Sequence, residues 1–177
     1  MKKNSILKKI QEIYKTLRTQ KKGNFNRTLS FGDYFTDRWE KAEFLGFGKG
    51  SSVYDNVLVL GDVKVGENTW IGPNVVLDGS GGLSIGSNCA IGAGVQMYSH
   101  NTVKRTLSGG NDPIELSETI IGDNTHIGPN TIILSGVKIG NQVVIAAGSV
   151  VTNNFPDSVM IGGSPAKIIK EISSKTF

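Results

Sequence analysis

The chain has a single cysteine, no long apolar run and few aromatic residues. One thiol, Cys89, cannot form an internal disulfide, which is compatible with a reducing compartment. No stretch approaches the roughly 18 apolar residues that a membrane-spanning helix needs. The basic start is not followed by the apolar segment of a secretory signal. We therefore expect a cytoplasmic protein.

Aromatic residues make up 7% of the 177 positions, whereas glycine occurs 23 times. The mean hydropathy of −0.11 is typical of a soluble domain. A chain of this length forms one domain with room for a short appendage. The composition thus predicts a turn-rich fold with small residues at many corners.

Basic residues are concentrated near the N-terminus. Residues 1–22 hold eight lysine or arginine residues and one glutamate, so this segment carries +7 and the remainder −3 of the net +4. Apolar residues at helical spacing predict an amphipathic helix over residues 4–19. They are Ile6, Leu7, Ile10, Ile13, Tyr14 and Leu17. We expect the helix to pack on its own protein or on a sister subunit, with weak contact to an anionic membrane surface as the alternative. Nucleic acid is not an expected partner, because no recognition motif accompanies the charge.

Residues 23–50 combine seven aromatic side chains with several charged ones. We expect this irregular segment to cover an apolar surface and, with the preceding helix, to form an N-terminal unit at residues 1–50. Contact with a substrate is the alternative role, and Arg38 is its candidate residue.

From Val53 onward an aliphatic residue recurs at every sixth position. Two extra residues near 79–82 and a longer excursion between Met97 and Ile121 interrupt the series. The recurring residues are Val53, Val59, Val65, Ile71, Leu77, Ile85, Ile91, Met97, Ile121, Ile127, Ile133, Ile139, Ile145 and Val151. Stacked triangular coils produce this period, whereas helices and hairpins do not. We predict an all-β, left-handed parallel β-helix over residues 51–157 with a loop at 98–120, followed by a C-terminal segment with a short helix at 158–177.

Each hexad is expected to form one flat side of a coil, with its first residue pointing inward. Three hexads close a turn, so equivalent residues stack in columns and the backbone pairs between coils. Glycine often follows the inward residue, as at Gly66 and Gly122, and asparagine occupies corner positions such as Asn68 and Asn124. We expect both residue types to ease corners at which φ is left-handed.

The longer excursion begins at Tyr98-Ser99-His100-Asn101 and contains one of only two histidines. Loops on a regular scaffold are where function is commonly added. A neutral imidazole at this point can take a proton from an attacking hydroxyl or amino group. From the residues alone, His100 is either such a base or an ordinary surface histidine.

The repeats, the segment at 98–101 and the ending Ile161-Gly162-Gly163-Ser164-Pro165-Ala166-Lys167 together resemble the hexapeptide-repeat acyltransferases. The resemblance covers roughly residues 40–172, and the nearest groups are the nucleotide-sugar acetyltransferases and the galactoside and maltose O-acetyltransferases. It implies acetyl-CoA as co-substrate and a homotrimer with sites between subunits. It also implies that His100 is the general base.

The same resemblance suggests residues that bind the two substrates. The acceptor is expected at Asn74, Asp78 and Asn101, and the cofactor at His126, Gly128, Ala147, Thr152, Pro165, Lys167 and Lys170. A backbone amide near Gly128 or Ala147 is the expected oxyanion donor. Many sugar O-acetyltransferases carry tryptophan where this chain has His126, so that histidine is either a thioester contact or an exposed coil residue. For Lys167 and Lys170 the alternative is a solvated face of the C-terminal helix.

The chemistry expected from these residues is direct transfer without an acyl-enzyme. There is no Ser–His–Asp set, and Cys89 occupies an inward repeat position that suits packing. The histidines and carboxylates also lack the spacing of a metal site. The leading expectation is N-acetylation of an amino group on a TDP- or UDP-linked deoxy-sugar in surface glycan biosynthesis. O-acetylation of a sugar hydroxyl is the first alternative, and a non-catalytic scaffold is the second.

Overall fold

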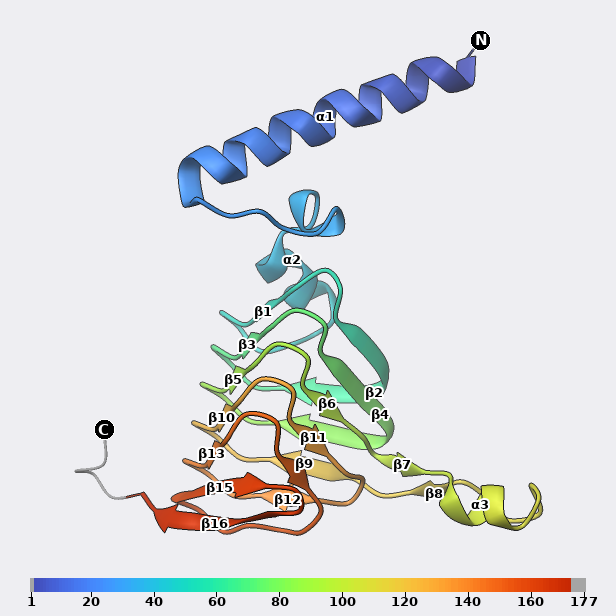
Figure 1. The fold of residues 1–177 in the computed structure, drawn as a ribbon, viewed down its shortest axis with the longest axis vertical. Helices are drawn as coiled ribbons and strands as arrows, with labels where there is room; N and C mark the ends of the chain where they lie inside the picture. The colour runs from blue at the N-terminus through green and yellow to red at the C-terminus, as the bar shows by residue number, and fades with distance from the viewer. Residues whose placement is uncertain (1, 173–177) are drawn as a thin grey trace.

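The computed structural model describes residues 2–172, with side chains from Ser5 onward. The helices are α1 (Lys2–Phe25), the 3-10 helix η1 (Gly32–Tyr34), α2 (Arg38–Phe44) and α3 (Val103–Leu107). The strands are β1 (Ser52–Val53), β2 (Leu58–Val65), β3 (Trp70–Ile71), β4 (Val76–Ile85), β5 (Ala90–Ile91), β6 (Gln96–Met97), β7 (His100–Asn101), β8 (Glu115–Leu116), β9 (Thr119–Ile121), β10 (His126–Ile127), β11 (Ile132–Ile133), β12 (Lys138–Ile139), β13 (Val144–Ile145), β14 (Val150–Val151), β15 (Val159–Gly163) and β16 (Ala166–Glu171). Most strands are very short and stack into a prism below α1 and α2 (Figure 1).

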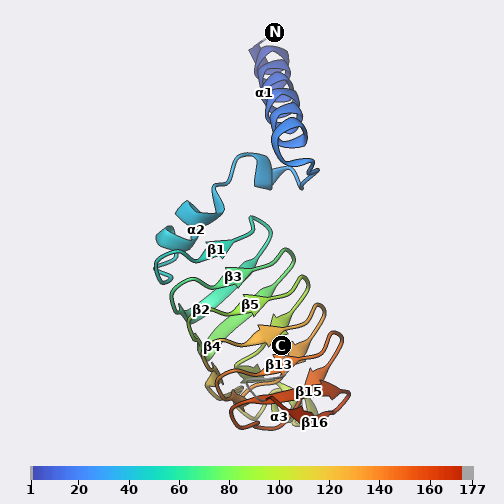
Figure 2. The same cartoon turned by 90° about the vertical axis from the view of Figure 1, so that its left-hand side faces the viewer.

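The coils of the prism have three flat faces. Face A stacks β1, β3, β5, β10, β13 and β15. Face B stacks the first parts of β2 and β4 on β6, β11 and β14, and face C stacks their second parts on β9 and β12. Apart from the β7–β8 and β15–β16 pairs, the strands pair in parallel, and Figure 2 shows the coils one below another. The expected parallel β-helix of six-residue repeats is confirmed.

Columns of aliphatic side chains fill the prism. Of the fourteen residues expected to point inward, thirteen are buried and Val59 is half-buried. Each fully buried Ile, Leu or Val side chain contributes about 2 kcal/mol relative to an exposed one. The six-residue period therefore identified the core almost residue by residue.

The glycines that follow the inward residues have a different purpose from the one expected. Gly122 and Gly128 do not have positive φ. A Cβ at Gly128 would lie 2.4 Å from the amide nitrogen of Ala147 in the next coil, and a Cβ at Gly122 would lie 2.6 Å from Gly140. Close approach of neighbouring coils therefore requires glycine there. The left-handed backbone falls on the asparagines instead, with φ of 54° at Asn68 and 55° at Asn124.

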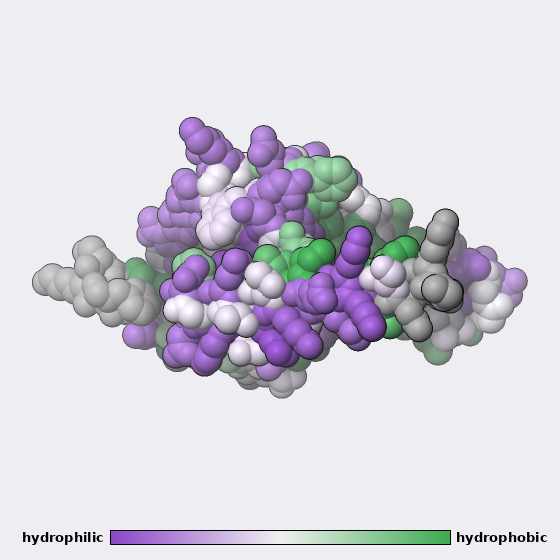
Figure 3. Space-filling model, turned by 90° about the horizontal axis from the view of Figure 1, so that it is seen from above, coloured by the Kyte–Doolittle hydropathy of each residue, from purple (hydrophilic) through white to green (hydrophobic). Residues whose placement is uncertain are grey.

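The N-terminal helix is longer than expected, since α1 spans Lys2–Phe25 instead of residues 4–19. Its contact with the rest of the chain is local: the Tyr14 ring packs on Phe31 and Tyr34, with ring centroids 5.2 and 5.4 Å apart. Towards its N-terminus the apolar side chains are 42–60% exposed, and these are Ile6, Leu7, Ile10 and Ile13. Seen from the N-terminal end, the surface over α1 is mainly hydrophilic (Figure 3). The apolar stripe is therefore largely uncovered within one chain.

The segment at 23–50 is less irregular than expected, because it contains η1 and α2. It covers the prism only in part: Ala42 and Phe47 are buried and join the core cluster at the first coil, whereas five of its aromatic side chains are at least 50% exposed, namely Phe25, Phe31, Phe35, Trp39 and Phe44. The Lys41 ammonium group donates to the carbonyl oxygens of Tyr54 and Asp55, at 2.9 and 2.6 Å. Burial lowers the pKa of Lys41, and nearby Asp55 and Asp33 partly offset that effect. These contacts fix α2 over the open end of the prism.

The expected C-terminal helix is wrong for residues 158–172. The chain there forms β15 and β16, which pair antiparallel with Ile161 opposite Ile168. β16 contains the β-branched residues Ile168 and Ile169, which favour a strand, and β15 offers an edge to pair with. The expected helical face for Lys167 and Lys170 is wrong as well, since both lie exposed on β16. Any helix at 173–177 lies outside the described residues.

Candidate active site

A structured arm leaves the prism where face B meets face C. We call this edge corner BC, and name the other two edges corner AB and corner CA in the same way. In the arm, β7 pairs antiparallel with β8, and α3 lies near the tip (Figure 1). The Lys104 ammonium group lies 2.5 Å from the Glu115 carboxylate across the arm. The hydroxyl of Thr119 donates to the carbonyl of Tyr98 at 2.7 Å where the chain rejoins the prism. The loop expected at 98–120 is therefore ordered by its own contacts.

Ser99 ties the start of the arm to the preceding coil. It is fully buried, and its hydroxyl donates to the Asp78 carbonyl at 2.6 Å while accepting from the Gly81 amide at 2.8 Å. Leu77 and Met97 are paired in neighbouring coils, so the residues that follow them leave the same corner. The register of the repeat therefore brings residues 78 and 99 together.

The imidazole of His100 is held by a buried carboxylate. Its Nδ1 lies 2.5 Å from Oδ2 of Asp78. The Asp78 side chain is 1% exposed, whereas that of His100 is 35% exposed. Oδ1 of Asp78 also accepts hydrogen bonds from the amide and the hydroxyl of Ser80, at 3.0 and 2.5 Å, and Oδ2 accepts one from the Ser99 amide at 3.1 Å. The orientation of the ring is thus set by a carboxylate that is itself held by hydrogen bonds.

Two opposing effects set the pKa of Asp78. Burial raises it, but hydrogen bonds from the Ser80 hydroxyl, from His100 and from the amides of Ser99 and Ser80 outweigh burial and lower the pKa to about 2. The carboxylate is therefore ionised at neutral pH and accepts the hydrogen of Nδ1. In that tautomer the lone pair of the ring lies on Nε2.

Nε2 of His100 is available for chemistry. No described residue forms a hydrogen bond with it, and the ring is partly exposed at the base of the arm. A positioned imidazole with a free lone pair can remove a proton from a nucleophile, and the carboxylate behind it stabilises the imidazolium that forms. The imidazole of His100 is thus arranged as a general base, with the ionised carboxylate of Asp78 behind it.

The structure corrects the role expected for Asp78. The sequence suggested that it contacts the acceptor, but both of its carboxylate oxygens are buried and hydrogen-bonded within the chain. It lies behind the His100 ring, and its carboxylate contacts Nδ1. The signal for this was present in the repeat, because Leu77 and Met97 hold equivalent positions. Asn101 does lie next to the base in β7, where its side-chain oxygen accepts from the Val103 amide at 2.9 Å and starts α3.

The other expected site residues lie on different parts of the prism. Corner AB carries Asn74, Gly128 and Ala147; β10 on face A carries His126; corner BC, two coils beyond His100, carries Thr152; the β15–β16 hairpin carries Pro165, Lys167 and Lys170; and α2 carries Arg38. Consecutive hexads alternate among three faces, so closeness in sequence does not place residues on one edge. Within one chain, only Asp78 and Asn101 of the expected set accompany His100.

The backbone donors expected for an oxyanion differ in their availability. The Gly128 amide donates to the Ile145 carbonyl at 2.8 Å, so it belongs to the ladder between coils and the expectation is wrong for this residue. The amide of Ala147 forms no hydrogen bond with any residue from 2 to 172, and the residue is exposed on corner AB. Asn74 on the same corner accepts from the Asn56 side chain at 2.7 Å, which engages its oxygen within the chain.

The thiol of Cys89 is a packing group. The residue is 2% exposed, its sulfur lies 3.3 Å from the Gly122 carbonyl oxygen, and burial raises the pKa of the thiol. Thiolates are the nucleophilic form, so this environment suppresses reactivity. Among residues 2–172 no cluster of three or more histidine, cysteine or acidic side chains is placed to hold a metal ion, and no helix is long and apolar enough to cross a membrane.

Two family models match the repeats on either side of the arm. The hexapeptide repeat of succinyl-transferase matches residues 62–98, and the bacterial transferase hexapeptide of six repeats matches residues 118–153. Over these two ranges the chain is similar to the hexapeptide-repeat transferases. The first match ends at Tyr98, two residues before His100, and the second begins at Glu118, between β8 and β9, so most of the arm lies outside both matched ranges.

Hexapeptide-repeat relatives extend the comparison. A tetrahydropyridine-dicarboxylate N-acetyltransferase of Clostridium perfringens is 49% identical over 65 residues, which are 37% of this chain and 28% of the relative. A hexapeptide-repeat acetyltransferase of Vibrio cholerae, solved with acetyl-CoA, is 27% identical with a TM-score of 0.67 over 94% of this chain and 90% of the other. A galactoside acetyltransferase solved with CoA is 26% identical with a TM-score of 0.69 over 94% and 84%. The chain spans less than a third of the length of the Clostridium relative.

Proposed function

We propose that the protein transfers an acetyl group from acetyl-CoA to a small acceptor, with His100 as the general base. The observation that carries the proposal is the buried Asp78 carboxylate behind the ring, with Nε2 unengaged at the base of the arm. Solved relatives that match 94% of the chain hold acetyl-CoA or CoA, which supports this cofactor class.

The proposed reaction is a direct attack within a ternary complex. Nε2 of His100 takes a proton from the acceptor as its oxygen or nitrogen bonds to the thioester carbon. The tetrahedral intermediate collapses, the bond to sulfur breaks, and the imidazolium returns its proton to the leaving thiolate of CoA. The ionised Asp78 carboxylate stabilises the imidazolium in between. No side chain is acylated, in keeping with the buried Cys89.

For the acceptor, we propose an amino group of a TDP- or UDP-linked deoxy-sugar used in surface glycan synthesis. An alkylammonium group must lose its proton before it attacks, which a histidine at neutral pH can assist. The N-acetyltransferase relative supports transfer to nitrogen. Likeness to a galactoside acetyltransferase supports the alternative, transfer to a sugar hydroxyl. A non-catalytic scaffold is the remaining alternative.

We further propose a homotrimer in which the cofactor lies between neighbouring prisms. Residues of corner AB and of the β15–β16 hairpin would then face corner BC of another chain, which would unite the cofactor residues expected from sequence with His100. The residues brought to that corner would be Ala147, Pro165, Lys167 and Lys170, beside His126 of face A, while Thr152 already lies on corner BC of the chain that supplies His100. The cytoplasm is the proposed location, since the glycan precursors named above are nucleotide-linked.

The shape of the chain supports this assembly. Ile10 and Ile13 lie one turn before Tyr14 and Leu17 on the same side of α1, and Tyr14 packs on η1. The apolar stripe therefore faces the side on which the prism stands. The helix that carries it extends past the prism on the side of the arm (Figure 1). That placement favours a neighbouring chain over an anionic membrane surface as the contact of α1.

The acceptor screen that tests the function measures CoA release from acetyl-CoA. We expect turnover with a TDP- or UDP-linked amino sugar, and a fall of about 1000-fold in His100→Ala, with unchanged thermal unfolding. Turnover of simple glycosides with every amino sugar inert would establish the O-acetylation alternative. Absence of acetyl-CoA binding in calorimetry would leave a non-catalytic scaffold as the remaining alternative.

A further inference from the structure

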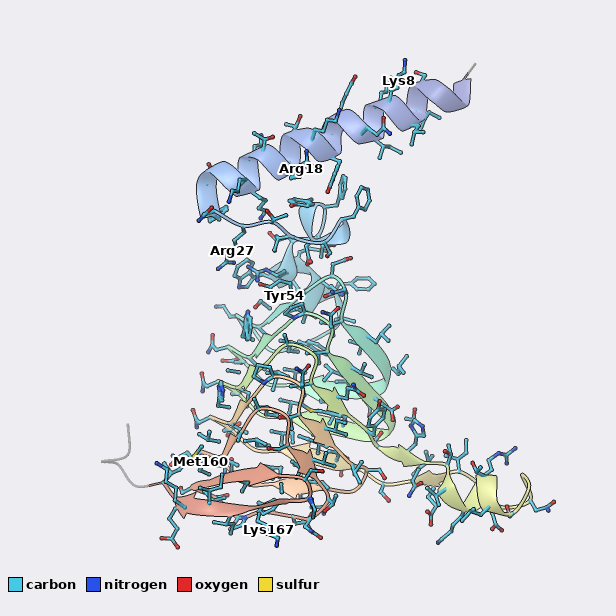
Figure 4. All side chains as sticks on the ribbon, viewed as in Figure 1. Lys8, Arg18, Arg27, Tyr54, Met160 and Lys167 are labelled. Atoms are coloured by element: carbon cyan, nitrogen blue, oxygen red, sulfur yellow. The ribbon has the colours of Figure 1, made fainter. Side chains whose placement is uncertain are left out.

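A cavity lies at the N-terminal end of the molecule, away from the arm. It has a volume of about 350 Å³, within the range of small-molecule pockets. The end of α1, the segment after it and the start of α2 form its walls. Its charged and aromatic lining residues are Lys21, Phe25, Arg27, Asp33, Asp37, Arg38 and Trp39. Figure 4 shows Arg27 between the end of α1 and the first coils, on the opposite side of the prism from the arm.

Three cations surround this cavity without a carboxylate partner. Lys21, Arg27 and Arg38 form no ion pair with any described residue. The guanidinium group of Arg38 lies over the ring of Tyr54, at 4.5 Å from its centroid, which holds it in place without neutralising it. Unpaired guanidinium groups that converge on a cavity favour an anion with several oxygens, such as a phosphate.

The acidic residues Asp33 and Asp37 offset two of the three positive charges, so the lining keeps one net positive charge. Both oxygens of Asp33 are engaged and buried, one by the Ser30 hydroxyl at 2.5 Å and the other by the Asp55 amide at 2.9 Å. Asp37 caps α2, with one oxygen accepting from the Trp39 amide at 2.9 Å. Its second oxygen has no hydrogen-bond partner among residues 2–172, and it is placed to accept from a sugar hydroxyl.

Two aromatic rings of the cavity are more than half exposed, although a cation lies over one face of each: Lys21 is 5.4 Å from the Phe25 centroid and Arg38 is 5.1 Å from that of Trp39. Trp39 is 55% exposed and Phe25 is 61% exposed. Large rings left open beside cations are the pattern by which proteins stack a nucleobase and bind its phosphates. A free phosphate needs no ring, and an apolar ligand needs no arginine. The combination selects a ligand that has both a flat ring and a diphosphate.

We propose that this cavity binds a nucleoside diphosphate, with the base against Trp39 and Phe25 and the phosphates between Arg27, Arg38 and Lys21. That this nucleotide is the handle of the acceptor sugar rests on the proposed function; the binding itself does not. Within one chain the cavity lies several coils away from His100. The cavity of one chain would therefore hold the nucleotide while the attached sugar reaches His100 of a neighbouring chain.

The test uses tryptophan fluorescence of the full chain. The protein has two tryptophans, and Trp70→Phe leaves Trp39 as the reporter. We expect TDP and UDP to quench it saturably, and Arg27→Ala and Arg38→Ala each to weaken binding at least tenfold. The matched control, Lys15→Ala, removes a charge from α1 outside the cavity and should bind as the parent does. Calorimetry on the same variants checks that lost quenching means lost binding.

Several outcomes would overturn the site: no saturable binding of either nucleotide, equal weakening in Lys15→Ala, or no weakening in Arg27→Ala and Arg38→Ala. If pyrophosphate binds as tightly as TDP, the nucleobase does not contribute to binding and the proposed stacking is wrong. If thymidine binds as tightly as TDP, the phosphates do not contribute and the proposed contacts with the cations are wrong. The assay contains no acetyl-CoA and no sugar. Nucleotide binding without any acetyl transfer would therefore count against the proposed function and leave the site intact.

Discussion

Corner CA and corner BC carry similar polar residues, but these residues have different roles. On corner CA, each coil places a polar side chain under an amide of the coil before it. The Ser87 hydroxyl accepts from the Glu67 amide at 3.0 Å, Asp123 from the Ser87 amide at 2.7 Å, Asn141 from the Asp123 amide at 2.8 Å, and Asp157 from the Asn141 amide at 2.8 Å. The result is a continuous ladder in which each side chain is occupied by backbone.

Corner BC interrupts such regularity at the third coil. Asp78, Ser80, Ser99 and His100 converge on one point instead of following one another along the axis. Three of them are occupied by the chain, and His100 retains an unused nitrogen. The difference shows that a polar side chain stabilises this fold when an equivalent residue in the next coil repeats its hydrogen bond. It becomes available for chemistry where the column is broken.

The largest effect should come from breaking the convergent corner. Replacing Asp78 by Asn removes the negative charge behind Nδ1 and allows the wrong tautomer, so we expect kcat/KM for acetyl transfer to fall about 100-fold. The KM for acetyl-CoA should be little changed, because Asp78 is buried away from substrates. Steady-state kinetics with the acceptor identified by the screen would measure both.

A fall in affinity for acceptor without a fall in kcat would instead support the original expectation that Asp78 contacts the sugar. An unchanged rate would show that the carboxylate is structural only. Thermal unfolding of Asp78→Asn should accompany the kinetics, so that a partly unfolded sample is recognised.

A smaller effect should appear in stability at low pH. The pKa of Asp78 is about 2 in the folded chain and about 3.9 in an unfolded one. The unfolded state therefore binds the proton first, and about 2 kcal/mol of stability present above pH 4 is lost as the pH falls to 2. Urea unfolding at pH 5 and near pH 2 measures this loss. Asp78→Asn should lose less over the same range by about that amount; equal losses in both proteins would contradict the proposed hydrogen bonds.

The smallest effect should come from the ladder. Asp123→Ala removes the acceptor of the Ser87 amide on corner CA, and we expect the free energy of unfolding to fall by about 1 kcal/mol. The rate of acetyl transfer should stay within twofold of the parent. A large loss of rate with intact folding would erase the distinction between the two corners.

The sequence allowed the repeat and its core to be predicted because burial of one residue in six is a local pattern. It misassigned Gly122 and Gly128, whose requirement comes from the backbone of a neighbouring coil and not from their own φ. It also missed β16, although Ile168 and Ile169 favour a strand, because the edge of β15 with which it pairs is formed only in the folded chain. Local patterns were readable, whereas contacts between coils were not.

The site shows the same division. His100 was identifiable from the place at which the period stops, although its role rested on resemblance. The partnership with Asp78 depends on stacking of Leu77 on Met97 across the two-residue insertion. The repeat carried that signal, whereas the contact between the two side chains was visible only in the folded chain. The cavity beside Trp39 and Arg27 unites two N-terminal segments for which no sequence period exists.

The most direct test of the central claim is a double-mutant cycle on kcat/KM for acetyl transfer, using Asp78→Asn, His100→Ala and the double variant. If Asp78 acts through His100, the double variant should match His100→Ala within about twofold, because the second change removes support for a base already absent. A further fall of about 100-fold in the double variant would show that the two residues act independently, and would contradict the account.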